Sequence, residues 1–299
     1  MTTYWDERLV QEQAALWDKG YLVTGELKKE YTRAAQQIAR DMSALYDRIQ
    51  SGTATANDLY KYNRLYKMMA EVNKELKKLN AKEVRLLERD FRDLYDANQR
   101  MLRSEFGFTS KLPKSAADKV IRAIWAPDAM NWSKRCWIDK AKLIQSLEKG
   151  LIDCVVRGAS RQEVVAQIRD EFDTSYYRAD RLVRTELNYI QTQSTLDQYA
   201  AEGIEKYMII DAGDYPGSGV KPERECTTCR NLADGGPYPV AKAEAGVNLP
   251  PIHPNCRCTI APYNNNGILG YLAGMTDEEI QAEKKRLQAE ALLKNAVNG

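Results

Sequence analysis

Apolar residues recur at alternating spacings of three and four over the first hundred positions, and this rhythm constrains the fold more than any other feature of the chain. Such spacings place side chains on one face of an α-helix and are typical of coiled-coil-like seams. The first run consists of Ala35, Ile38, Met42, Leu45 and Ile49. The second consists of Leu65, Met69, Val72, Leu76, Leu79, Val84, Leu87, Phe91 and Leu94. The pattern therefore predicts long amphipathic helices.

A break between the two runs indicates that the chain reverses there. Residues 51–54, Ser-Gly-Thr-Ala, interrupt the pattern, and Thr55-Ala-Asn-Asp58 has the spacing of a capping box. We therefore expect two long helices that pack antiparallel. The segment 106–113, which contains glycine and ends in proline, is expected to close this hairpin.

Capping and turn signals predict a central helical region. Ser115-Ala-Ala-Asp118 restarts a helix, Pro127 interrupts it, and Ser160-Arg-Gln-Glu163 caps another. A further long helix is expected from about Ser175 to Ala201, with Gly203 after its end.

Large apolar residues of this central region are expected to form a packed core rather than a binding platform. They are Ile124, Trp125, Trp132, Trp137, Leu143, Leu147 and Leu151. Cys136 and Cys154 lie in apolar helical patterns and are expected to belong to the core as well.

The last third of the chain has a different character. Residues 206–211 read as a short apolar strand, and the loops after it contain Cys226-Thr-Thr-Cys229 and His253-Pro-Asn-Cys256-Arg-Cys258. Thiolates and an imidazole at such spacings are typical of a tetrahedral zinc site. Because so short an irregular segment buries little apolar surface, a metal would supply the missing cross-link.

Five candidate ligands compete for the four positions of a closed zinc site. The preferred set is Cys226, Cys229, His253 and Cys256, and it assumes that Cys256 and Cys258 do not both face one ion. The competing set replaces His253 by Cys258. In either case we expect a structural zinc ion.

Other chemistry for the same residues has less support. A hydrolase or transferase with Cys256 as nucleophile and His253 as base needs an orienting group and an oxyanion hole, and neither is visible. A redox dithiol lacks its βαβ context. A catalytic zinc needs an open position and a general base, and His253 is the only histidine. Buried thiols without metal remain an alternative.

Three arginines recur at a spacing of three on the expected helix at 175–201. Arg178, Arg181 and Arg184 thus form a basic ridge. One interpretation is a solvated ridge paired with nearby acids such as Asp180, and the other is a contact surface for phosphate or an acidic partner. The sequence leaves both open.

Overall charge and hydropathy exclude some classes of protein. The chain has 44 Lys and Arg against 42 Asp and Glu, a net charge of +2, which argues against a protein that coats nucleic acid. No apolar run reaches the roughly 20 residues of a membrane-spanning helix, and the N-terminus lacks a signal-peptide pattern. We therefore expect a cytosolic origin, where free thiols and metal ligands are commoner than disulfides.

The order of motifs resembles the phage Mu F-like minor head proteins, also called head morphogenesis proteins. The resemblance spans about residues 115–262 and rests on four motifs in the same order. They are Arg181-Leu-Val-Arg184-Thr185-Glu186, Cys226-x-x-Cys229, Gly246-Val-Asn-Leu-Pro250-Pro251 and His253-Pro-Asn-Cys256-Arg257-Cys258. The N-terminal region is similar in character to minor capsid proteins of tailed phages that infect Gram-positive bacteria.

The resemblance implies a virion protein present in few copies inside the head near the portal vertex, made in the host cytoplasm. Its implied partners are the portal protein, the major capsid or scaffold protein and packaged double-stranded DNA, and its implied role is head morphogenesis. Some family members carry fused enzyme domains. Residues 259–299 are too short for one, so we expect no enzymatic activity.

Two other functions compete with this interpretation. A zinc-dependent DNA-binding module is disfavoured because Pro251, Pro254 and Pro262 occupy the region where a base-reading helix would follow. A hydrolase or transferase centred on Cys256 and His253 is the third class.

The predicted fold is mainly α. A long-helix hairpin at 1–110 is followed by a central helical domain at 111–203, an irregular α+β Cys/His-rich module at 204–265, and a C-terminal tail at 266–299 with a helix from Thr276.

Overall fold

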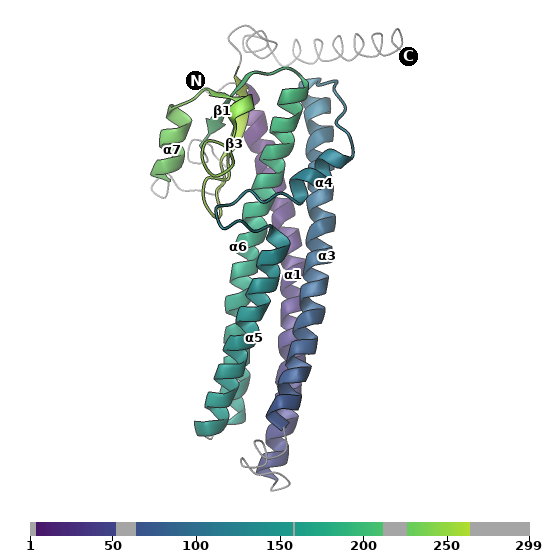
Figure 1. Ribbon diagram of the computed structural model, residues 1–299, viewed down its shortest axis with the longest axis vertical. Helices are drawn as coiled ribbons and strands as arrows, with labels where there is room; N and C mark the ends of the chain where they lie inside the picture. Colours follow the sequence, from purple (N-terminus) through teal and green to yellow (C-terminus); the bar gives the residue numbers. More distant parts are fainter. Residues whose placement is uncertain (1–3, 52–63, 158, 212–225, 264–299) are drawn as a thin grey trace. The chain divides into compact units, whose positions relative to one another are not determined.

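The structure, a computed structural model, describes residues 4–51, 64–157, 159–211 and 226–263. It confirms a mainly helical fold with a small antiparallel sheet in the cysteine-rich part. The helices are α1 (Tyr4–Gln50), α3 (Arg64–Phe106), α4 (Ser115–Ile121), α5 (Trp132–Arg157), α6 (Arg161–Ala201) and α7 (Thr227–Asp234) (Figure 1). The strands are β1 (Lys206–Ile210), β2 (Tyr238–Pro239) and β3 (Thr259–Tyr263), and a 3₁₀ turn, η3, spans Val240–Lys242.

The chain divides into two compact units, each assembled from segments that are separate in the sequence. Among the described residues, unit 1 comprises 4–20, 89–129, 184–211 and 226–263, and unit 2 comprises 21–51, 64–88, 130–157 and 159–183. Three of the four divisions fall inside α1, α3 and α6, whereas the regions expected from the sequence follow one another along the chain. The predicted helix from Thr276 and the whole region 266–299 lie outside the described residues.

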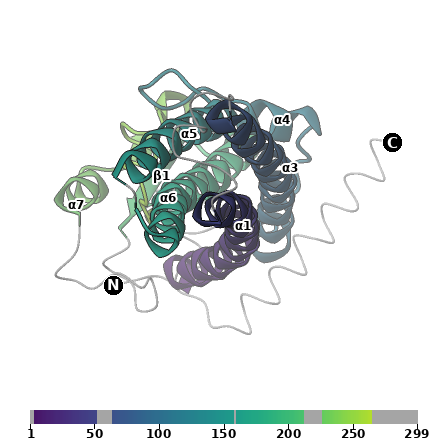
Figure 2. The same ribbon diagram turned by 90° about the horizontal axis from the view of Figure 1, so that it is seen from below.

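Unit 2 is built from α5 and from parts of α1, α3 and α6, which lie around one another when seen end-on (Figure 2). The predicted seams supply much of its core. Their buried members in this unit are Ile38, Met42, Met69, Val72, Leu76, Leu79 and Leu87. Ala35 and Val84 are half-buried. The side chains of Leu45, Ile49 and Leu65, and the predicted capping box at 55–58, lie outside the described residues.

A charged cluster lies within the core of unit 2. The Lys140 ammonium group is 2.6 Å from Glu83 Oε2 and 3.6 Å from Asp139 Oδ2, and it also contacts the Tyr31 hydroxyl. The Ser175 hydroxyl donates to Asp139. Burial, reinforced by the negative charge of Glu83, raises the pKa of Tyr31. The partners come from four helices, and sliding α3 past α5 would separate the buried charges of Glu83 and Lys140.

The ends of α6 confirm two predicted signals. At its start the Ser160 backbone N–H donates to Glu163 Oε2 at 2.7 Å, and the Glu163 N–H donates to Ser160 Oγ at 3.3 Å, which is a capping box. At its end Gly203 has a φ of 73°, and the Ile204 N–H donates to the Tyr199 carbonyl at 2.9 Å. The prediction of a separate helix from Ser175 is wrong. Because residues 161–201 contain neither glycine nor proline, nothing ends the helix that begins at Arg161.

The predicted tryptophan-rich core is wrong for two residues. Trp137 is 51% exposed and Ile124 is 63% exposed. The buried face of α5 comprises Trp132, Cys136, Lys140, Leu143, Leu147 and Leu151. Trp137 directly follows one of these positions and so points about 100° away from that face.

The region between α3 and α5 also departs from its predicted helix. Ile124 lies beyond the end of α4, which stops at Ile121, well before Pro127. Although this helix begins at Ser115 as expected, its N-cap is Lys114 and no side chain caps it. Cys136 is buried as predicted, and the side chain of Cys154 lies outside the described residues.

Unit 1 contains the sheet, with strand order β2-β1-β3 and antiparallel pairing throughout. In β1, Lys206 lies opposite Tyr263 and Ile210 lies opposite Thr259. This confirms the strand predicted near 206–211. Within the same unit α3 packs on α6, where Asn98 Nδ2 donates to Thr195 Oγ1 at 3.0 Å.

The described part of the chain contains no helix that is long and apolar enough to cross a lipid bilayer.

Candidate metal centre

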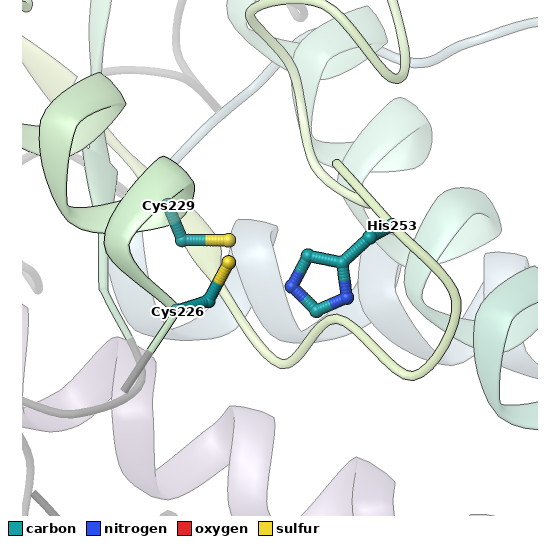
Figure 3. Close-up of side chains that lie close together, drawn as sticks. All are labelled: Cys226, Cys229 and His253. Carbon is teal, nitrogen blue, oxygen red and sulfur yellow. The ribbon is translucent and has the colours of Figure 1, made fainter. Parts of the chain in front are cut away.

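The cysteine and histidine side chains come from two segments of unit 1. Cys226 is the N-cap residue of α7, and Cys229 lies in its first turn, so a spacing of three brings both thiols to the same side of the helix start. Figure 3 shows these thiols side by side, with the imidazole of His253 facing them from the loop before β3. Cys256 and Cys258 follow in the same loop.

All five predicted ligands converge, and Cys229 is the residue they share. The ligand atoms of Cys226, Cys229 and His253 lie within 4.8 Å of one another, and so do those of Cys229, Cys256 and Cys258. The Sγ atoms of Cys229 and Cys256 are 3.9 Å apart. Tetrahedral zinc with Zn–S bonds of about 2.3 Å separates its sulfurs by about 3.8 Å. The donor atoms therefore fit a zinc ion in chemistry and in spacing.

The assumption that Cys256 and Cys258 do not face one ion does not hold. The Sγ atoms of Cys256 and Cys258 both lie within 4.8 Å of Cys229 Sγ and of each other. A tight turn precedes them, in which the Cys256 N–H donates to the His253 carbonyl at 3.0 Å and Asn255 has a φ of 61°. The geometry thus keeps Cys258 as an alternative ligand.

The thiol cluster favours a thiolate at Cys256. The hydrogen bond from the Cys229 thiol lowers the pKa of Cys256 well below its usual value, although burial opposes it. The same hydrogen bond to Cys256 raises the pKa of Cys229, because that proton is shared with the neighbouring sulfur. A cation placed among these sulfurs would replace the shared protons.

His253 is oriented by its own neighbour. Its Nδ1 lies 2.9 Å from the Pro254 carbonyl, which accepts only, so Nδ1 carries the proton and Nε2 is left for a metal. Burial alone would lower the pKa of His253, but the bond to Pro254 and the adjacent Cys256 and Cys226 raise it. Burial would likewise raise the pKa of Cys226, but a hydrogen bond from the backbone N–H of Cys229 lowers it.

Cys258 also has a partner outside the cluster. Its thiol donates to Asp211 Oδ1 at a distance of 3.8 Å, and both side chains are buried. Asp211 directly follows β1, so this contact links the cysteine loop to the sheet.

The polar face of α6 holds the cysteine loop, a role that the sequence did not reveal. Asn188 Nδ2 donates to the carbonyls of Cys256 and Cys258, each at 3.0 Å. One turn earlier on α6, Thr185 Oγ1 accepts the Asn255 N–H at 3.1 Å. The sequence did contain a signal, because this helix carries many polar residues besides its arginines. Only the arginines were interpreted as functional.

The neighbouring motif residues also hold the fold of unit 1. Glu186 accepts a hydrogen bond from the Trp125 indole at 3.0 Å, and that ring stacks on Tyr189 with centroids 4.8 Å apart. In the Gly246–Pro251 motif the Asn248 carbonyl accepts from the Tyr207 hydroxyl at 2.9 Å. The motif residues other than the cysteines therefore stabilise the fold of unit 1.

The three arginines of the predicted ridge, Arg178, Arg181 and Arg184, do not form a uniform exposed surface on α6. Arg178 lies 3.5 Å from Asp139 with its side chain 45% exposed, and Arg181 is exposed. Arg184 is half-buried and belongs to unit 1, whereas the other two belong to unit 2.

Comparison with protein families confirms the resemblance seen in the sequence. Residues 145–261 match the family described as phage Mu protein F like protein. The matched segment contains the three arginines and all five candidate ligands, and it begins 30 residues later than the resemblance suggested at 115. The comparison with curated proteins gave no match, and neither did the comparison with solved structures.

Proposed function

We propose that this chain, with its phage Mu protein F like segment at residues 145–261, is a structural minor head protein of a tailed bacteriophage. It acts in head morphogenesis and resides in the virion. The family match carries this proposal, because the matched segment holds both the arginine helix and the Cys/His centre.

We further propose that the chain binds the phage portal protein inside the head, near the portal vertex. The major capsid or scaffold protein and packaged DNA are the other proposed partners. The length of α1, α3 and α6 supports this, since long helices offer extended docking surfaces. The near-neutral net charge of +2 suits a protein that lies beside DNA without condensing it.

Deletion of the gene from a phage that encodes the chain tests the proposed role. We expect the protein in purified wild-type heads by mass spectrometry, and malformed or DNA-poor heads in its absence. Normal infectious particles without the protein would contradict a role in head morphogenesis.

We also propose that Arg178, Arg181 and Arg184 contact the portal protein or packaged DNA, and charge reversal tests this contact. Changing Arg178, Arg181 and Arg184 to Glu should reduce incorporation into heads or retention of DNA. Reversal of three other arginines with exposed side chains, Arg33, Arg161 and Arg169, is matched in net charge and should have no such effect. Normal incorporation and DNA retention in the first variant would exclude this contact.

We also propose that the Cys/His centre binds one structural zinc ion. The ligands are Cys226, Cys229, His253 and Cys256, with Cys258 as the alternative to His253. The ion would cross-link the start of α7 to the loop before β3. The convergence of the five donors on Cys229 supports this proposal.

Metal analysis of purified protein should find about one zinc per chain. Loss of zinc in His253→Ala but not in Cys258→Ser supports the first ligand set, and the reverse supports the second. Protein without zinc whose proteolysis is unchanged by a chelator would exclude the site.

The two other classes are separable by experiment. A zinc-dependent DNA-binding module would show DNA affinity that falls steeply with salt. A strand, β3, rather than a base-reading helix follows Cys258, which disfavours this class. For a hydrolase or transferase, Cys256→Ser would abolish turnover, whereas for a structural site it abolishes metal binding or folding.

A further inference from the structure

We infer that Asn188 of α6 is a positioning residue for the metal centre, which fixes the cysteine loop in the conformation that turns two thiols toward Cys229. This inference rests on the zinc ion proposed above. According to this inference, a side chain that is not itself a ligand contributes to the affinity for the metal.

Both N–H groups of the Asn188 amide donate hydrogen bonds to the cysteine loop. Its two N–H groups match two acceptors, the carbonyls of Cys256 and Cys258, at 3.0 Å each. Its oxygen accepts from Thr192 Oγ1 at 3.3 Å, so the amide has a defined orientation. The side chains of Asn188 and Thr192 are 2% and 1% exposed, so water does not compete for these bonds.

The spacing of the two acceptors explains what the amide fixes. Both carbonyl oxygens lie 3.0 Å from the same nitrogen, so they are at most about 6 Å apart, which is shorter than the roughly 6.6 Å that two residues span in an extended strand. Asn188 therefore holds residues 256–258 in a curled conformation just before β3 begins at Thr259. In this conformation the Sγ atoms of Cys256 and Cys258 lie within 4.8 Å of each other. The thiols of Cys256 and Cys258 therefore both lie beside Cys229.

A second contact holds the turn before these cysteines. The Asn255 N–H donates to Thr185 Oγ1 at 3.1 Å, and Thr185 lies three residues before Asn188 on α6. Side chains three apart lie on the same helix face, so one face of α6 holds both the turn and the Cys256–Cys258 segment that follows it. Without Asn188 the loop carbonyls lose buried donors, and the thiols lose their fixed direction.

The test measures metal affinity in the full-length protein and in Asn188→Ala. Zinc affinity is obtained by competition with a chromophoric chelator, and Co²⁺ absorption reports the ligand geometry. We expect Asn188→Ala to weaken zinc binding by about 10- to 100-fold, the usual effect of removing a group that orients metal ligands. Its metal-loaded thiols should also react faster with Ellman's reagent.

Asn98→Ala is the matched control. Asn98 is another buried asparagine of unit 1, 1% exposed, and its amide donates to Gln191, Ser194 and Thr195 of α6. Both variants should lower the unfolding midpoint, but Asn98→Ala should keep wild-type zinc affinity. Should Asn188→Ala not fold, Asn188→Asp keeps the size and the acceptor for Thr192 while removing both donors, and the same loss of affinity is expected.

The possible failures are distinguishable. Wild-type affinity in the Asn188 variants, or an equal loss in Asn98→Ala, overturns the inference and leaves the zinc site standing. Wild-type protein that binds neither Zn²⁺ nor Co²⁺ overturns the proposed zinc site and this inference with it.

Discussion

The Nζ atom of Lys140 lies 2.6 Å from Oε2 of Glu83, with the two side chains only 3% and 1% exposed. Removing one partner of such a pair leaves an uncompensated buried charge and costs about 3–5 kcal/mol, whereas replacing both by apolar residues is often neutral. We predict that Lys140→Met lowers the free energy of unfolding by about that amount. Lys140→Met with Glu83→Leu should recover most of the loss in urea denaturation.

Lys74→Met is the control for this prediction. Lys74 lies 3.2 Å from Glu71, and both side chains are about 60% exposed, so its removal should change stability by about 0.5 kcal/mol or less. Equal losses in Lys74→Met and Lys140→Met would show that burial does not set the strength of the Lys140 pair. A double variant no more stable than Lys140→Met would assign the loss to packing instead.

Substitution by alanine should have opposite effects on stability at two glycines that have open space around them. At Gly203 and at Gly25 an added Cβ meets no atom within 4 Å, so sterics with neighbours play no part. Gly203 has a φ of 73°, where a side chain costs about 1 kcal/mol, while Gly25 lies inside α1, where alanine gains up to about 1 kcal/mol. Gly203→Ala should therefore lower the melting temperature and Gly25→Ala raise it.

Asparagine at position 203 provides the check on this argument. Asparagine tolerates the left-handed conformation better than alanine, so Gly203→Asn should lose less stability than Gly203→Ala. Equal melting temperatures for all three proteins would show that the positive φ at the end of α6 is not maintained in solution.

The fold was predictable where the signal was local. The spacing of Ile38, Met42, Leu76 and Leu79 identified buried helix faces, and the Ser160–Glu163 capping box identified a helix start, because both depend on residues within one or two turns. Trp137 was mispredicted because its neighbours in the sequence were considered without its position on the helix. Apolar character alone does not determine which face of α5 is buried.

The ligands of the candidate metal centre were predictable from the sequence, but the residues that hold the cysteine loop in place were not. Cysteine and histidine spacing depends on short segments, so the five candidates were identified from the sequence. Asn188 lies 68 and 70 residues from the cysteines whose carbonyls it holds, and Lys140 lies 57 residues from Glu83. No periodicity connects such positions. Only the folded backbone shows which polar side chain meets which distant group.

The stability contributed by Asp197 should depend on pH. Burial raises the pKa of Asp197, although hydrogen bonds from Gln193 and Tyr95 oppose the shift. A raised folded-state pKa means that the folded protein holds this proton more tightly than the unfolded chain. The resulting stability is complete below the ordinary carboxyl pKa of about 4 and is lost as pH rises through the raised value.

Asp197→Asn removes this dependence, because an amide does not ionise. The stability of the variant relative to wild type should increase as pH rises above about 4 and then level off. Unfolding free energies at a series of pH values measure it, and Asp96→Asn, which removes an exposed carboxylate, controls for net charge. A difference between Asp197→Asn and wild type that stays constant with pH, or decreases, would contradict the assigned shift.

Metal removal should loosen one part of the protein and spare the other. The segment between η3 and β3 contains little regular secondary structure, so its backbone depends on side-chain anchors and on the proposed zinc ion. Chelation should therefore increase hydrogen exchange in α7 and in residues 243–263. Amides of α5 around Lys140, which belong to unit 2 and its own buried core, should exchange at an unchanged rate.

Return of zinc should restore protection, whereas Mg²⁺ should not, since thiolates bind it weakly. Uniform loosening of both units would mean that the ion stabilises the whole chain, and unchanged exchange throughout would mean that the cysteine loop holds its conformation without metal.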